Sequence, residues 1–455
     1  MNLWTSAEIA EAAGGEASEA FTVAGTAFDS REVGPDDLFV AMQGEVTDGH
    51  RFLPQAFAQG AAGAIVSEPC DGPHVRVADS FAALQALGRA SRARTGAKVI
   101  GVTGSVGKTS CKEALYAALE RSNRDRVHRS VKSYNNHTGV PLSLARMPRD
   151  ARFGVFEMGM NHAGELAALT RLVRPHVAVV TAIAPAHIEF FESEAAIADA
   201  KAEIFQGLEP GGVAVVPCDS PHRDRLIAAA REHAGRVVTF GMGRSADVHA
   251  REAMRVPTGG TFVTATLSGG RELSFTVAQP GRHWVSNALA VLAAVDAVGA
   301  DLGQAGLALA EMGGLPGRGA RLAVPIAGGE ALLIDESYNA NAASMRAGLA
   351  VLAHEPGRKI AVLGEMRELG ARSAELHADL AEPIEAARVQ TALLVGEAMR
   401  PLARALEGRA EVVHVPDAVA ALDRLRPMLA PGDAVLVKGS NGVGLSRLVA
   451  ALGAG

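Results

Sequence analysis

One short segment, residues 98–110, restricts the possible folds of this chain more than any other. It reads KVIGVTGSVGKTS, an apolar run that enters a glycine-rich loop and continues into a helical pattern over residues 110–120. Gly104 and Gly107 allow the loop's backbone N–H groups to converge on phosphate oxygens, and the following helix offers its positive N-terminal end to the same anion. A strand, a phosphate loop and a helix in this order predict a nucleotide-binding domain built on a parallel sheet.

Two side chains in this loop supply chemistry. Lys108 can reach the β- and γ-phosphates of a nucleotide, and the Thr109 hydroxyl can ligate Mg²⁺. Only the shorter G-x-x-G-K-[ST] core of the Walker A pattern is present, because Val102 stands where the longer pattern has glycine. The alternative, a glycine-rich turn with an incidental lysine, is not favoured in this strand–loop–helix context. The departure at Val102 favours a specialised ligase loop over that of a generic motor ATPase.

The rest of the chain alternates strand-like and helical patterns, and its 455 residues suggest roughly three domains. Residues 1–95 carry short strand-like runs that end in a helix, and residues 96–315 repeat apolar strands followed by helices. Such runs predict a parallel sheet with both faces covered. Within them, residues 248–278 alternate polar and apolar side chains around Gly-Gly turns, which predicts antiparallel hairpins. A linker at 313–321 precedes a second βα alternation, so we expect an α/β fold with a third domain over residues 316–455.

Composition and charge argue against several functional classes. A formal net charge of −6 gives no overall attraction to nucleic acid or to an anionic membrane. The basic run at 121–132 lacks interleaved aromatic residues, so it is better explained by a solvated face or by substrate contacts. Cys70, Cys111 and Cys218 are too far apart for a zinc cluster or a disulfide framework. The N-terminus has no signal-peptide pattern, and no apolar stretch reaches about 18 residues. We therefore expect a soluble, cytoplasmic protein with no membrane insertion.

Three further residues are candidates for metal binding or catalysis. Glu157 ends an apolar run, where it can hold a Mg²⁺ bound to nucleotide phosphates or make an ordinary turn bond at the end of a strand. His187 also follows an apolar run, although a lone histidine is more often structural. Lys201 lies in a helical pattern, where a lysine is usually solvated. The local sequence leaves these alternatives open.

Taken together, the motifs resemble those of the Mur ligase family over nearly the whole chain. Within that family, the chain resembles most specifically the branch that joins D-alanyl-D-alanine to UDP-N-acetylmuramoyl-tripeptide. The matching segments are DSR…DGH at 29–50, TGSVGKTSCK at 103–112, YNNHTGVP at 134–141, EMGMNHAGE at 157–165, APAHIE at 184–189, AKAEIF at 200–205, GRHWVSN at 281–287, PGRG at 316–319, SYNAN at 337–341, LGEMRELG at 363–370 and VKGS at 437–440. Their order and spacing are far more specific than any single motif.

The resemblance implies a role for each matching position. Residues that would contact ATP are Thr103, Gly104, Ser105, Val106, Gly107, Lys108, Thr109, Ser110, Asn287, Arg318 and Asp335. Residues that would hold Mg²⁺, with two ions expected, are Thr109, Glu157, His187 and Lys201, the last as a carbamate. The catalytic set would be Lys108, His187, Lys201 and Arg318. Asn136 would lie near the phosphates or the metal.

The outer domains would hold the other substrates, small molecules in both cases. The N-terminal domain would bind the UDP end through Ser30, Arg31, Asp48, Gly49 and His50. The C-terminal, Rossmann-like domain would place the dipeptide near Ser337, Tyr338, Asn339 and Asn341. Two departures from the family pattern, Ala342 and Asn441, fall in this domain. A monomer is expected.

The implied reaction activates a carboxylate as an acyl phosphate, which the amine of D-Ala-D-Ala then attacks. Closure of the C-terminal domain, with Arg318 in its linker, would exclude water. One rival is the sister ligase that adds the third amino acid, but its DNPR-like motif is absent from this sequence. Folate-polyglutamate ligases share the phosphate loop but lack the DSR…DGH domain. A regulatory protein that has lost ligase activity is disfavoured because Lys108, Thr109 and Glu157 are all present.

Overall fold

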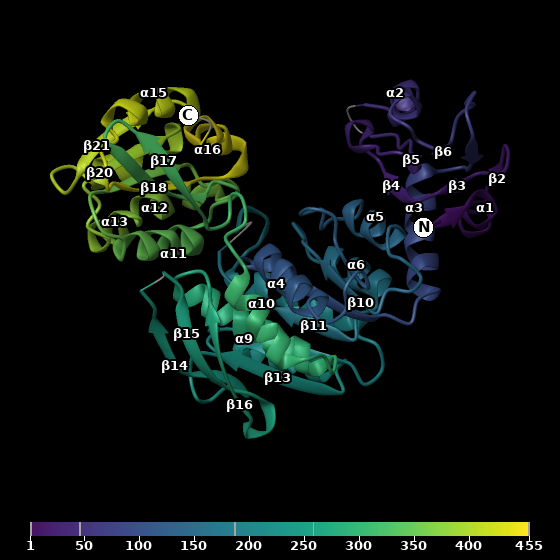
Figure 1. Cartoon of the computed structure of the whole chain (residues 1–455), viewed down its shortest axis with the longest axis horizontal. Coiled ribbons are helices and arrows are strands. Elements are labelled where there is room, and N and C mark those ends of the chain that lie inside the picture. The colour runs from purple at the N-terminus through teal and green to yellow at the C-terminus, as the bar shows by residue number, and fades with distance from the viewer. Residues whose placement is uncertain (1, 45–46, 186–187, 258, 454–455) are drawn as a thin grey trace.

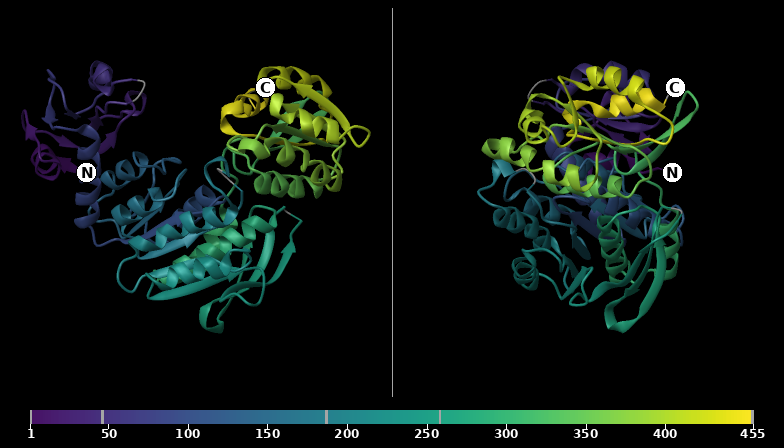
Figure 2. Two further views of the ribbon diagram at one scale, coloured as in Figure 1. Left: turned by 180° about the vertical axis from the view of Figure 1, so that it is seen from behind. Right: turned by 90° about the vertical axis from the view of Figure 1, so that its left-hand side faces the viewer.

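The computed structural model describes residues 2–44, 47–185, 188–257 and 259–453. It contains three α/β domains in sequence, each with its own main sheet, as predicted. The N-terminal and C-terminal domains lie apart from each other, and each is attached to the central domain (Figures 1 and 2). Within the described residues, no helix is both long enough and apolar enough to span a bilayer.

The N-terminal domain is built on a five-stranded sheet in the order β2-β7-β6-β5-β4, in which only the β2–β7 pair is antiparallel. Its strands are β2 (Glu16–Ala17), β4 (Gly25–Ala27), β5 (Asp37–Val40), β6 (Gly63–Val66) and β7 (His74–Arg76), with β1 (Trp4–Thr5) and β3 (Thr22–Val23) paired separately. Its helices are α1 (Ser6–Ala13), α2 (Leu53–Ala58) and α3 (Ser80–Ala93). The sheet buries short aliphatic runs on both faces.

Helix α3 also fastens the N-terminal domain to the central one. The Ser91 hydroxyl donates to the Met147 carbonyl over 3.3 Å, and the Arg92 guanidinium donates to the carbonyls of Val173 and Arg174 over 2.8 Å each. The indole N–H of Trp4 donates to the carbonyl of Ala145, which lies in α5 of the central domain. Because these donors are buried or partly buried, the joint is a packed interface rather than a flexible linker.

The central domain has a nine-stranded sheet in the order β16-β15-β14-β13-β12-β11-β8-β10-β9. Its strands are β8 (Lys98–Thr103), β9 (Val127–Arg129), β10 (Phe153–Glu157), β11 (Val177–Val180), β12 (Val213–Pro217), β13 (Arg236–Gly241), β14 (Val248–Arg255), β15 (Thr261–Thr266) and β16 (Glu272–Val277). Its helices are α4 (Lys108–Glu120), α5 (Gly139–Ala145), α6 (Glu165–Val173), α7 (Glu194–Ala202), α8 (Arg223–Arg231), α9 (Arg282–Ala297) and α10 (Leu302–Glu311).

Packing on this sheet explains its apolar strands. Helices α4, α9 and α10 cover one face and α5 to α8 the other, so β8, β10, β11 and β12 are buried on both sides. The predicted hairpins at 248–278 are antiparallel, and they extend the central sheet because β14 pairs in parallel with β13. The basic run contains the edge strand β9, which was not predicted.

The C-terminal domain has a six-stranded sheet in the order β17-β18-β22-β19-β20-β21. Its strands are β17 (Ala320–Ile326), β18 (Gly329–Glu336), β19 (Lys359–Gly364), β20 (Thr391–Val395), β21 (Glu411–Val415) and β22 (Ala434–Lys438). Its helices are α11 (Ala342–Ala353), α12 (Ser373–Ala378), α13 (Ala381–Ala386), α14 (Arg400–Ala405), α15 (Ala418–Met428) and α16 (Leu445–Gly453). The strand β17 was not predicted; it forms an antiparallel edge against β18, directly after the linker.

An ion-pair cluster holds the C-terminal domain against the central one. The Glu355 side chain is only 3% exposed and lies between two guanidinium groups. Arg255 of β14 contacts it over 2.9 Å and also donates to the His354 carbonyl, while Arg321 of β17 contacts the second carboxylate oxygen over 2.5 Å. A buried carboxylate with two cationic partners is well compensated, so the cluster fixes this relative placement of the domains.

Two histidines of the central domain predict that its stability decreases in acid. Burial lowers the pKa of both His128 and His176 to about 4. Because that is below the ordinary value of about 6.5, the unfolded chain takes up protons first as pH falls, and stability is lost between about pH 6.5 and 4. Between pH 7 and 4.5 the thermal midpoint of the His128→Gln variant should fall less steeply than that of wild type. The expected difference between the two slopes is about 2 °C per pH unit. The same replacement at the exposed His233 provides the control. Equal slopes for wild type, His128→Gln and His233→Gln would contradict the prediction.

Candidate active site

The phosphate loop follows β8 and is held between two neighbouring elements. Gly104 has φ 147°, and a Cβ there would lie 2.0 Å from the Thr181 hydroxyl beyond β11. Gly107 has φ 87°, and a Cβ there would lie 2.8 Å from the side-chain oxygen of Asn287 in α9. Both positions therefore require glycine for space as well as for backbone conformation. Asn287, predicted at the nucleotide, lies beside the loop.

The polar groups of the loop fit a phosphate. The Ser105 hydroxyl is buried and has no hydrogen-bond partner among the described residues. The Lys108 ammonium donates to the carbonyl of Gly104 over 2.7 Å, and burial lowers its pKa. A buried hydroxyl without a partner and an ammonium held only by its own loop are groups that an anion would satisfy.

A buried carboxylate meets the loop at the end of the neighbouring strand β10. Glu157 is 1% exposed, and its carboxylate accepts hydrogen bonds from the Thr109 hydroxyl over 2.8 Å and the Asn135 amide over 2.7 Å. Its backbone N–H donates to the Ser130 hydroxyl. A carboxylate and a threonine hydroxyl in contact are an oxygen donor set that suits Mg²⁺. The prediction named Asn136, but that side chain accepts backbone N–H bonds at the start of α5, and the adjacent Asn135 contacts Glu157 instead.

Lys201 lies in the interior and not on the surface. It is 1% exposed at the end of α7, and its ammonium nitrogen has no hydrogen-bond partner among the described residues. Burial, followed by the charge of Lys108, holds its pKa well below the usual range. Carbamylation requires a deprotonated amine, so a lowered pKa and the lack of a hydrogen-bond partner among the described residues make Lys201 suited to it. His187, the other predicted ligand, lies outside the described residues.

The phosphate loop from Ser105 to Ser110, with Asn135 and Glu157, lines one wall of a cavity of about 490 Å³ between the central and C-terminal domains. The Arg318 guanidinium, from the interdomain linker, stacks over the Tyr338 ring at 4.1 Å on the opposite side. Asn339, which the sequence analysis places near the dipeptide, also lines the cavity. Among the lining residues that had no predicted role are four with polar or aromatic side chains: His283, Trp284, Glu336 and Lys438. All four lie in or beside the motifs GRHWVSN, SYNAN and VKGS, which was the signal available in the sequence.

Three predicted residues support the cavity from behind and do not line it. The buried Asp335 carboxylate accepts from the backbone N–H groups of Gly317 and Ser337 over 2.6 and 3.0 Å, and from the Ser337 hydroxyl over 2.6 Å. It therefore ties the linker to the turn that follows β18. Asn341 caps α11. Ala342 begins this helix, at the position where proline is favoured in helices generally, so the family's proline and this alanine both fit.

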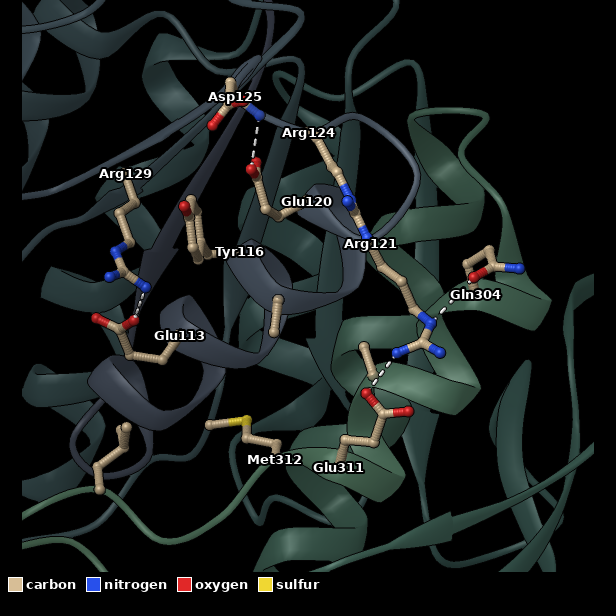
Figure 3. A pocket seen from close by; sticks show the side chains of 13 residues that line it. Glu113, Tyr116, Glu120, Arg121, Arg124, Asp125, Arg129, Gln304, Glu311 and Met312 are labelled. Carbon is tan, nitrogen blue, oxygen red and sulfur yellow. Dashed lines mark hydrogen bonds and ion pairs between the residues drawn. The ribbon is translucent and has the colours of Figure 1, made fainter.

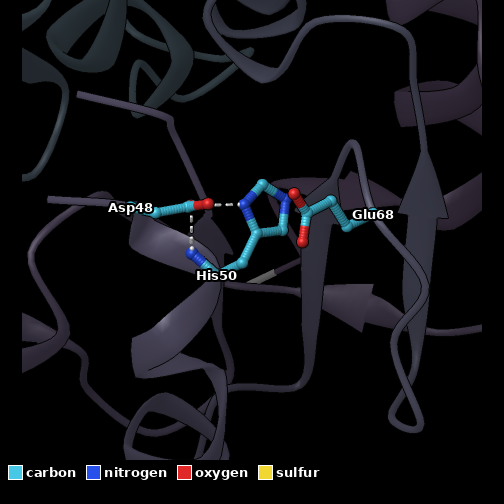
Figure 4. Close-up of side chains that lie close together, drawn as sticks. All are labelled: Asp48, His50 and Glu68. Atoms are coloured by element: carbon cyan, nitrogen blue, oxygen red, sulfur yellow. Dashed lines mark hydrogen bonds and ion pairs between the residues drawn. The ribbon is translucent and has the colours of Figure 1, made fainter. Parts of the chain in front are cut away.

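In the N-terminal domain, the structure groups the predicted Asp48 and His50 with Glu68 (Figure 4). The His50 ring donates from Nδ1 to Asp48 over 2.7 Å, and its Nε2 accepts the Ser67 N–H over 3.0 Å. Because both ring nitrogens are engaged, the cluster offers no free imidazole lone pair to a metal. At Gly49, a Cβ would lie 2.7 Å from a backbone nitrogen. The cluster is a rigid turn.

The other predicted residues of this domain lie in a second turn. The Ser30 hydroxyl is buried and donates to Gln55 over 3.0 Å. Arg31 is exposed and forms a two-point ion pair with Asp29. Both residues belong to the short 3₁₀ helix Ser30–Glu32, whose last residue contacts the central domain.

A larger groove, about 910 Å³, lies on the outer side of α4 against α10 (Figure 3). Two of its three arginines are paired: Arg129 with Glu113, and Arg121 with Glu311 and Gln304. Acidic side chains thus offset the charge of these two arginines, and the groove lacks the glycine-rich backbone of the phosphate loop. The smaller cavity, not this groove, has the chemistry for a nucleotide.

A cavity that opens between two α/β domains, with a phosphate loop on one wall, is what a multidomain ATP-dependent ligase requires. Three family descriptions match the chain in order: Mur ligase family, catalytic domain, at 22–94; Mur ligase middle domain, at 102–295; and Mur ligase, glutamate ligase domain, at 321–441. The chain belongs to the Mur ligase family.

Curated relatives and solved structures agree with that membership. The UDP-N-acetylmuramoyl-tripeptide–D-alanyl-D-alanine ligase of Escherichia coli is 36% identical over 93% of this chain and 92% of its own length. The ligase of the same name from Bacillus subtilis is 32% identical over 95% and 93%. A crystal structure of MurF from Acinetobacter baumannii superposes with a TM-score of 0.85 at 31% identity, covering 99% of both chains. MurF of Thermotoga maritima, solved with ADP, gives 0.77 at 26% identity, covering 94% of this chain and 97% of that one.

Proposed function

We propose that this protein joins D-alanyl-D-alanine to UDP-N-acetylmuramoyl-tripeptide, with ATP converted to ADP and phosphate. The observation that carries the proposal is the cavity in which the phosphate loop, the Glu157–Thr109 pair and the C-terminal residues Tyr338 and Asn339 face one another. The names of the relatives point to the same pair of substrates. The ADP in the Thermotoga structure supports the choice of nucleotide.

The residues of the central wall carry the first step. The terminal carboxylate of the tripeptide attacks the γ-phosphorus of ATP, the bond to the β-phosphate oxygen breaks, and an acyl phosphate and ADP result. Lys108 and the backbone N–H groups of the loop offset the negative charge on the transferring phosphoryl group. For this contact, Lys108 exchanges the Gly104 carbonyl for phosphate oxygens, which keeps its charge compensated inside the cavity.

Glu157, Thr109, His187 and a carbamylated Lys201 would hold the two Mg²⁺ ions in this proposal. When bound, the ions neutralise phosphate charge and align the reacting oxygens. Carbamylation joins the neutral Lys201 amine to CO₂ and releases one proton, which converts a buried group without a partner into an anion. The burial of Lys201 and its lack of a partner support this assignment.

The residues of the C-terminal wall serve the second step, in which the dipeptide amine attacks the acyl carbon and phosphate leaves. Tyr338 and Asn339 line the cavity where this amine would enter, and Asp335 orders the turn that carries them. Arg318, stacked on Tyr338, closes the side of the cavity nearest the linker and limits the entry of water.

Phosphate release tests this proposal directly. The protein is incubated with ATP, Mg²⁺ and UDP-N-acetylmuramoyl-tripeptide, and either D-Ala-D-Ala or single amino acids are added. We expect release to require the dipeptide, with kcat between about 1 and 10³ s⁻¹. Release with a single amino acid and UDP-N-acetylmuramoyl-dipeptide would assign the chain to the sister ligase. ATP binding without release under any combination would indicate a regulatory protein and would contradict the proposal.

A further inference from the structure

Residues 130–136, here named the bridging segment, lie between the N-terminal domain and the buried Glu157. The segment follows the edge strand β9 and ends at the start of α5. Lys132 within it has a left-handed backbone, with φ 48°, which is unusual for a residue other than glycine. Surrounding contacts must therefore hold the segment in place.

On one side, the bridging segment is held by a single carboxylate of the N-terminal domain. Glu32 accepts a hydrogen bond from the Tyr134 hydroxyl over 2.7 Å and pairs with the Lys132 ammonium through the same oxygen. The Phe28 ring packs on Tyr134, with centroids 5.4 Å apart. Glu32 is also the last residue of the turn that carries Ser30 and Arg31.

The protonation states of Glu32 and Tyr134 suit the hydrogen bond between them. Although burial raises the pKa of Glu32, hydrogen bonds from Lys132 and Tyr134 bring it below the usual value. Burial, with the same hydrogen bond from the other side, raises the pKa of Tyr134 to about 12. At neutral pH Glu32 is thus an anion that accepts, and Tyr134 is a phenol that donates.

On its other side, the bridging segment holds Glu157. Ser130 accepts the backbone N–H of Glu157 over 2.9 Å, and the Asn135 amide donates to the Glu157 carboxylate over 2.7 Å. The Asn135 carbonyl accepts the N–H of Gly159 over 2.7 Å. The segment therefore sets the backbone position of Glu157 and the orientation of its carboxylate.

We propose that Glu32 is a positioning residue for the Mg²⁺ site, acting from the N-terminal domain through Tyr134 and Asn135 on Glu157. The inference rests on the proposed function, because it assigns metal binding to Glu157. Residues that orient a metal-binding carboxylate from the next layer commonly change metal affinity by about 10–100-fold when removed. The turn Ser30–Glu32 thereby links the part of the molecule proposed to hold the UDP end to the site of phosphoryl transfer.

The same interface provides a matched control. Glu8, also in the N-terminal domain, pairs with Arg149 of the central domain, but Arg149 does not contact Glu157. Trp4, Ser91 and Arg92 hold the two domains together independently of Glu32. Replacement of either glutamate by glutamine should therefore leave the domains docked, and only the Glu32 variant should disturb the metal site.

The test measures the Mg²⁺ concentration for half-maximal binding of a non-hydrolysable ATP analogue, by calorimetry, together with kcat, KM and the thermal midpoint. For Glu32→Gln and Tyr134→Phe we expect this concentration to rise about tenfold. The value of kcat should fall about as much, with the KM for ATP at saturating Mg²⁺ within twofold and the midpoint within about 2 °C of wild type. Glu32→Asp should recover part of the loss, and the double variant should be no worse than the single ones because they act through one contact.

Other outcomes would overturn the inference. An unchanged Mg²⁺ requirement in Glu32→Gln, or equal effects of Glu32→Gln and Glu8→Gln, would show that Glu32 does not act on the metal site. A lowered thermal midpoint that Glu32→Asp does not recover would show a structural role only. Binding of the ATP analogue requires neither UDP-N-acetylmuramoyl-tripeptide nor D-Ala-D-Ala. The binding measurement therefore tests the role of Glu32 even if phosphate release shows that the proposed acceptor is wrong.

Discussion

Replacement of Lys108 by alanine is expected to lower the rate of phosphate release by about a thousandfold, or about 4 kcal/mol of transition-state stabilisation. The reason is geometric. Lys108 is the lysine of the phosphate loop, and its half-buried ammonium lies at the loop carbonyl of Gly104 on the wall of the cavity. Stabilisation of the negative charge on the transferring phosphoryl group therefore depends strongly on Lys108. Steady-state phosphate release at saturating ATP and Mg²⁺ gives the measurement.

Two comparisons make this result interpretable. Lys98, exposed at the start of β8, provides a control whose alanine variant should stay within twofold of wild type. The thermal midpoint of Lys108→Ala should remain close to that of wild type, because the hydrogen bond that its ammonium makes to a described residue lies within its own loop. More than a tenth of wild-type activity in Lys108→Ala would remove Lys108 from the mechanism.

Replacement of Lys201 by methionine is expected to reduce activity by about a hundredfold or more while leaving the thermal midpoint unchanged or raised. In any molecule that is not carbamylated, a buried amine without a hydrogen-bond partner among the described residues destabilises the fold, and methionine fills a similar volume without a polar group. The loss of activity follows from the loss of the carbamate anion proposed at the Mg²⁺ site. A large loss of activity together with an unchanged or higher thermal midpoint would distinguish a role of Lys201 at the metal site from a role in packing alone.

Dependence on carbon dioxide supplies the independent measurement for Lys201. Wild-type protein prepared without CO₂ should lose activity and regain it with bicarbonate, and ¹³C-bicarbonate should give a carbamate resonance that Lys201→Met lacks. Lys112, the other buried lysine of this region, donates to the carbonyls of Ser130 and Lys132 and should not be labelled. Activity indifferent to CO₂, together with an active Lys201→Met, would contradict the carbamate.

Some features that the sequence did not predict are short, half-exposed strands. The edge strand β9 has three residues within a basic run, and β17 lies partly exposed beside a linker. Their apolar patterns are weak because only part of each is buried, and pairing with β10 and β18 makes them strands. The buried strands β8, β10 and β11 were predicted because each contains a continuous apolar run.

The sequence by itself determined the phosphate loop, because the loop geometry needs glycine at fixed spacing. It determined the α/β class, because a sheet covered on both faces needs apolar strands. The order and spacing of the motifs determined the family. Only the tertiary structure decided that Asn135 and not Asn136 contacts Glu157, that Asp335 ties the linker to a turn, and that Lys201 is buried with no hydrogen-bond partner in the described part of the chain. Glu32, distant in the chain from Tyr134, belongs to the same group. The physical reason is that hydrogen-bond partners far apart in sequence depend on how domains and loops are placed in space, which a local pattern of residues does not encode.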